Sequence, residues 1–94
     1  MRTRDRERLV TVLGSLCAQL RAALDDERCA YAPGEVRAHL ATAVSSVKDA
    51  LLLCQFGRHG TLEWALYADV AVTDAEHALA LYAAWQGGLE EART

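Results

Sequence analysis

The sequence predicts an all-α fold: a compact antiparallel bundle of about four helices, three long and one short, in a single domain over residues 1–94. Three observations support this prediction. Alanine and leucine, both strong helix formers, together make up about a third of the chain. Apolar residues recur at spacings of three and four, the period of one helix face. Short connections separate the helical segments, and such connections make neighbouring helices antiparallel.

The first expected helix covers residues 4–27. Five leucines form one stripe along it, because steps of three and four residues return to the same side of a helix. They are Leu9, Leu13, Leu16, Leu20 and Leu24. The arginines among residues 2–8 alternate with acidic residues, which predicts a solvated helix start. Residues 28–34 then form a connection, in which Cys29 is expected to be exposed.

The second expected helix covers residues 33–56 and carries its own apolar stripe. That stripe consists of Val36, Leu40, Val44, Val47, Leu51 and Cys54. Leu52 and Phe56 point away from it, and Leu53 lies on its flank. One buried face cannot account for all of these side chains, so they need a second contact, from the third helix or from another chain.

The second half of the chain predicts two further helices. Residues 62–71 fit a helix, although their apolar residues also alternate as in a strand. We favour the helix, because no other segment could pair with a strand here except a second copy of the chain across a dimer. Residues 73–86 form the fourth helix, with Thr73 and Glu76 as its capping box. The glycine pair 87–88 is expected to end it.

Composition limits the possible partners. The formal net charge is −3, from 10 basic and 13 acidic residues, so no nucleic acid is expected as a partner. No stretch approaches the ~18 apolar residues of a membrane span, so no membrane is expected either. The three cysteines are widely spaced and form no CxxC pair, which fits reduced thiols in a cytosol. We therefore expect a small, acidic, bacterial-like cytoplasmic protein.

Two carboxylate–histidine pairs make a transition-metal site the alternative prediction. Glu35 and His39 are four residues apart, and Asp74 and His77 are three apart, so each pair shares one helix face. Both pairs lie in the first turns of helices that would run parallel in an up-and-down bundle, which would place all four groups at one end. Carboxylates and histidines at such spacings bind metals in bundle cores.

His39 also suggests a third class of function. Ala38-His39 followed by Ala43 resembles the Ala-His…Lys-Gly pattern of histidine phosphotransfer domains, which are small helical bundles with one exposed histidine. The resemblance covers only this short segment. Thr42 stands where those domains have lysine and Ala43 where they have glycine, so the positive charge beside a phosphohistidine is missing. The resemblance implies phosphate transfer through His39.

The preferred prediction is a non-catalytic interaction or regulatory module. The sequence contains no G-x-S-x-G, P-loop or G-x-G-x-x-G motif, and no catalytic residue is assigned. No cofactor is expected unless the metal alternative holds. The module is expected to form a homodimer, with another protein as the alternative partner, through apolar residues of the second and third helices. These interface residues are Leu52, Leu53, Phe56, Trp64 and Tyr67.

Overall fold

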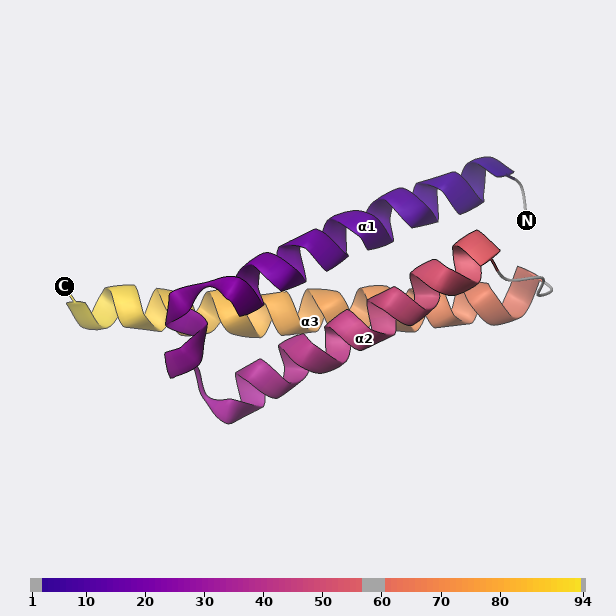
Figure 1. Ribbon diagram of the computed structural model, residues 1–94. Helices are drawn as coiled ribbons and strands as arrows, with labels where there is room; N and C mark the ends of the chain where they lie inside the picture. The colour runs from indigo at the N-terminus through magenta and orange to yellow at the C-terminus, as the bar shows by residue number, and fades with distance from the viewer. Residues whose placement is uncertain (1–2, 57–60, 94) are drawn as a thin grey trace.

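The computed structural model describes the backbone of residues 3–56 and 61–93 and the side chains of residues 6–56 and 65–89. Within these ranges it contains helices only, which confirms the all-α bundle. The elements are α1 (Thr3–Asp25), the short 3₁₀ helix η1 (Glu27–Tyr31), α2 (Gly34–Phe56) and α3 (Thr61–Arg93). They lie along one another in a body of 51 × 20 × 18 Å. Figure 1 shows the starts of α1 and α3 at one end, and η1 at the other.

A side-chain cap makes the turn between α1 and α2. The helix α1 ends at Asp25, and the carboxylate of Asp26 accepts a hydrogen bond of 2.9 Å from the backbone N–H of Arg28 at the start of η1. The same carboxylate forms an ion pair of 3.3 Å with the Arg28 guanidinium. An acidic residue is unfavourable at the negative end of α1, but it is favourable at the positive end of the next helix. The carboxylate of Asp26 therefore stabilises the start of η1.

The boundary predicted between residues 71 and 73 is wrong, because α3 is one helix of 33 residues. The expected capping box at Thr73 and Glu76 lies inside it. Buried residues follow one another at steps of three and four from Ala68 to Tyr82 without a change of phase. A helix that restarted at residue 73 would shift this register, and the packing it would lose outweighs a local cap worth about 1 kcal/mol.

The glycine pair 87–88 does not end the helix either, because α3 continues to Arg93. Glycine ends a helix when it adopts a positive φ angle that other residues avoid. No glycine in the described part of the chain has a positive φ. Gly87 and Gly88 therefore keep helical backbone angles, and they weaken the last turns without interrupting them.

We expect Gly88→Ala to stabilise the end of α3. A Cβ atom built at this position meets no other atom within 4 Å, and alanine is favoured over glycine in a helix by about 0.5–1 kcal/mol. The gain should appear as slower amide hydrogen exchange in the last turns. Gly14→Ala is the matched comparison, because it has the same free space but lies in the middle of α1, so it should raise the global stability instead. Faster exchange in Gly88→Ala would contradict this account.

One hydrophobic core lies between the three helices. The stripes predicted on the first two helices face it, and its largest fully buried side chains are Leu13, Leu20, Leu40 and Val47. The helix α2 contacts both neighbours more extensively than they contact each other. The contribution of α3 is different, because its fully buried residues are small, although Tyr82 is also buried in the core. The small residues are Ala68, Ala71, Ala75 and Ala78, each at most 1% exposed.

Candidate interaction surface

Over residues 66–78, α3 has alanines at its fully buried positions and several large apolar residues on its outer side. The fully buried residues over 68–78 are alanines, with Val72 packed partly beside them, and their small size lets the helix approach α1 and α2 closely. On the outside, the side chains of Leu66, Tyr67 and Val70 are 57–59% exposed. Burying a large apolar side chain stabilises a protein by about 1.5–3 kcal/mol, and these three residues gain only part of that. The outer side of α3 is therefore apolar beyond what the fold requires.

The last turns of α2 add two more exposed apolar side chains. Leu52 is 55% exposed and Phe56 is 77% exposed. Because α2 ends at Phe56 and α3 begins at Thr61, these residues lie at the same end of the bundle as the first turns of α3. We call the five residues together the apolar surface; they are Leu52, Phe56, Leu66, Tyr67 and Val70.

The apolar surface carries no charge and is large for so small a protein. A fully exposed aromatic side chain has about 200 Å² of accessible surface. On that scale, the exposed fractions of the five residues add up to roughly 500 Å². The summed area is comparable to the patches of about 300–600 Å² that are the largest on typical monomeric proteins and are often functional. A stable interface buries about 800 Å² on each partner, so this surface would supply most of one.

The structure places the predicted interface residues in three different situations. Leu52, Phe56 and Tyr67 are exposed at this end of the bundle. Leu53 is half-buried and packs against the core, so it is available only in part. Trp64 belongs to α3, but its side chain lies outside the described residues.

Sequence reasoning missed Leu66 and Val70 as surface residues. The apolar residues of 62–71, Leu66 and Val70 among them, were fitted to one helix face, and that segment was treated as separate from the helix after Thr73. The signal that could have found them is the spacing of residues 68, 71, 75 and 78, which continues to Tyr82. That line already fills the inner face of the helix, so it leaves Leu66 and Val70 outside.

The structure brings His39 and His77 together, but not all four predicted metal ligands. The two imidazole ring centres are 5.3 Å apart, and the ring planes are nearly perpendicular, at 81°. Glu35 is exposed one turn before His39, and Asp74 is half-buried one turn before His77. Among the side chains that the structure describes, no three histidine, cysteine, aspartate or glutamate residues gather closely enough to hold a metal ion.

The histidines meet for a reason other than the one predicted. Their helices were expected to run parallel, whereas α2 and α3 are antiparallel (Figure 1). His39 lies nearly as many residues before the end of α2 as His77 lies after the start of α3. Equal distances from a short connection bring two residues side by side in an antiparallel pair.

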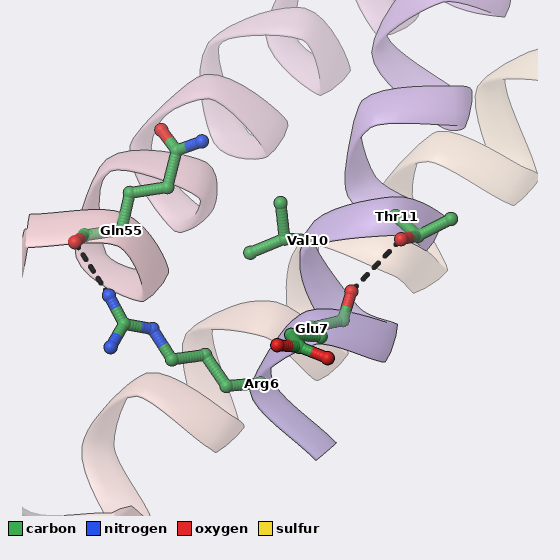
Figure 2. Close-up of a pocket in the computed structure, with 5 residues that line it drawn as sticks. All are labelled: Arg6, Glu7, Val10, Thr11 and Gln55. Atoms are coloured by element: carbon green, nitrogen blue, oxygen red, sulfur yellow. Dashed lines mark hydrogen bonds between the residues drawn. The ribbon is translucent and has the colours of Figure 1, made fainter. Parts of the chain in front are cut away.

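An arginine side chain crosses the hollow between α1 and the end of α2 and caps α2. Figure 2 shows the Arg6 side chain reaching across the hollow from α1. Its Nη2 donates a hydrogen bond of 2.6 Å to the carbonyl of Gln55, and its Nε donates to the carbonyl of Cys54. Helix ends leave such carbonyls unpaired, and a positive charge is favourable there. Arg6 therefore caps α2, which corrects the prediction that this arginine-rich segment is simply solvated.

The cysteines offer no reactive site in the described part of the chain. Cys17, Cys29 and Cys54 are all free and buried. The prediction that Cys29 is exposed is wrong, because η1 turns this side chain into the core, where it is 3% exposed. Burial raises the pKa of Cys54, although the nearby Arg6 opposes that effect. A thiol with a raised pKa is a poor nucleophile.

Tyr82 and Asp26 close the η1 end of the core. The ring of Tyr82 packs 5.8 Å from that of Trp85, centre to centre. Its hydroxyl is buried and makes no hydrogen bond within the described residues. Burial raises the pKa of Tyr82, and the negative charge of Asp26 adds to the effect. The hydrogen bond from the Arg28 backbone lowers the pKa of Asp26.

In the described part of the chain, no helix combines the length and apolarity needed to cross a membrane. Comparison with family models, curated proteins and solved structures found no match to this chain.

Proposed function

We propose that this protein is a non-catalytic module that self-associates as a homodimer through the apolar surface. The observation that carries the proposal is the arrangement of α3, which has alanines against the core and Leu66, Tyr67 and Val70 on its outer side. A helix that served only its own bundle would favour the opposite arrangement, because burying the larger side chains would stabilise it more.

A second copy of the chain is the occupant that fits this surface. In a symmetric dimer, the patch on one copy contacts the same patch on the other copy. The patch must therefore be complementary to itself. None of the five residues of the apolar surface is charged, so burying these side chains against a second copy removes no charge from water. Phe56 and Tyr67 supply aromatic side chains, the kind that dominates binding energy at such surfaces.

The chemistry of the remaining groups supports a non-catalytic role in the cytoplasm. The three thiols are free and buried, which suits a reducing compartment. The net charge of −3 supports a protein partner over a nucleic acid. The proposed function therefore involves assembly of the chain with itself.

We expect the double substitution Leu52→Glu and Phe56→Glu to convert the dimer into a monomer. Each glutamate would be buried unpaired in the interface, and the loss of one hot-spot residue costs about 2 kcal/mol or more, about a 30-fold weakening. Native mass spectrometry and sedimentation should give twice the chain mass of 10.3 kDa for the unaltered protein and the single chain mass for the variant.

The matched control is Tyr31→Glu. Tyr31 is 84% exposed but lies at the η1 end of the bundle, so its substitution should leave the dimer intact. Circular dichroism should show the same helix content in all three proteins. A monomeric unaltered protein at micromolar concentration, or a double variant that remains dimeric, would refute the proposed function.

A further inference from the structure

The contact between His39 and His77 is not explained by the core or by the apolar surface. His39 is half-buried on α2, and His77 is exposed on α3. The residues that follow them, Leu40 and Ala78, are fully buried, so core packing holds the two helices in register at this point. Two imidazoles are therefore kept adjacent on separate helices by the rigid part of the fold, as a preorganised pair of ligands requires.

We propose that His39 and His77 together bind one divalent transition-metal ion. Imidazole nitrogens are favoured ligands of zinc, copper and nickel. Zinc binds such a nitrogen at about 2.0–2.1 Å, which places each ring centre about 3.2 Å from the ion. Two rings at a tetrahedral angle then have their centres about 5.2 Å apart. The observed separation of 5.3 Å matches this value.

The ion fits with little movement of the protein. Because His77 is exposed, rotation of its side chain can turn a ring nitrogen towards the same point as His39 without moving the helix. A hollow of about 230 Å³ lies beside His39 on α2, lined by Glu35, Ala38, His39 and Thr42. No group of three or more histidine, cysteine, aspartate or glutamate side chains is found among the described residues, so water would complete the coordination of an ion held by the two histidines.

This site is independent of self-association. Tyr67, Val70, Asp74 and His77 follow one another along one strip of α3, since their spacings are three and four residues. The apolar residues occupy the start of the strip, and His77 lies about two turns beyond Val70. The bundle thus has an apolar end for assembly and a two-histidine site for a metal on the same face.

Zinc titration of the reduced protein tests the proposal, with calorimetry as the readout. The unaltered chain should bind one ion per chain. Holding the second ligand in place raises affinity by about 10²–10⁴, so His39→Ala and His77→Ala should each weaken zinc binding by roughly 100-fold. His59→Ala is the matched control, because it removes the third histidine of the chain and should leave zinc binding unchanged.

A second readout does not depend on the folding of the variants. In the unaltered protein, zinc should shift the imidazole proton resonances of His39 and His77 and leave those of His59 in place. Absence of saturable binding would overturn the proposal, and so would equal losses in His59→Ala and His39→Ala. The monomeric variant Leu52→Glu/Phe56→Glu should still bind zinc. If it does not, the ion is held between copies, and the assignment to one chain is wrong.

Discussion

Asp74→Pro is expected to destabilise the protein by about 3 kcal/mol or more, the cost of a proline inside a helix. Asp74 lies in the interior of α3, where its backbone N–H would be lost and the proline ring would collide with the preceding turn. If a helix instead began after Thr73, residue 74 would be its first position, where proline is favoured. The substitution therefore separates one continuous helix from two.

The measurement is the free energy of unfolding by urea. Asp74→Ala is the control, since it removes the same carboxylate but keeps the backbone hydrogen bond, and it should change the stability by less than about 0.5 kcal/mol. All variants should be compared at one protein concentration, because the proposed self-association would also stabilise the folded state. A proline variant as stable as the alanine variant would mean that α3 is interrupted at residue 73.

Leu40→Ala is expected to cost about 2–5 kcal/mol, the range for removing a fully buried leucine side chain. Leu40 is 0% exposed and lies on α2, the helix that contacts both of its neighbours. A domain of this size is stable by only about 5–15 kcal/mol in total, so the loss is a large fraction. Thermal unfolding should show a markedly lower midpoint.

The control for Leu40→Ala makes the same chemical change at an exposed position. Leu89 is 39% exposed on α3 and lies outside the apolar surface. Leu89→Ala should therefore cost much less than Leu40→Ala. Equal losses for the two variants would mean that burial in the described core does not determine the stability of this bundle.

The sequence was sufficient to predict the first two helices, because bulky residues mark their inner faces. Leu13, Leu20, Leu40 and Val47 repeat at steps that return to one side of a helix, and all four are fully buried. The start and end of α2 were also predicted closely, from Pro33 and from the glycine after Phe56. These signals are local, and local signals describe this part of the chain well.

The second half of the chain was harder to predict, because local and long-range signals disagree there. Thr73 and Glu76 have the spacing of a capping box, and Gly87 resembles a helix stop. Packing of Ala71, Ala75 and their neighbours against two other helices overrides both signals. Because the helix was divided near residue 72, the inner line of alanines was not followed back to Ala68, and the outward position of Leu66 was missed.

The candidate site was predictable in part. Exposure of Leu52 and Phe56 followed from counting the positions around one helix. The meeting of His39 and His77 depends on the length of two helices and the connection between them, and the predicted topology was different. The capping of α2 by Arg6 could not be predicted, because it joins residues 48 and 49 positions apart in the sequence.

The division of α3 into an alanine side and a large apolar side has a consequence for how this protein can change over generations. Any larger residue at position 71 or 75 would force the helices apart at a cost of about 1–3 kcal/mol, so the inner side has little freedom to vary. Leu66 and Val70 contribute little to the fold, so substitutions there are tolerated by the single chain. Mutation can thus alter the exposed side of α3 while the architecture of the bundle is inherited intact.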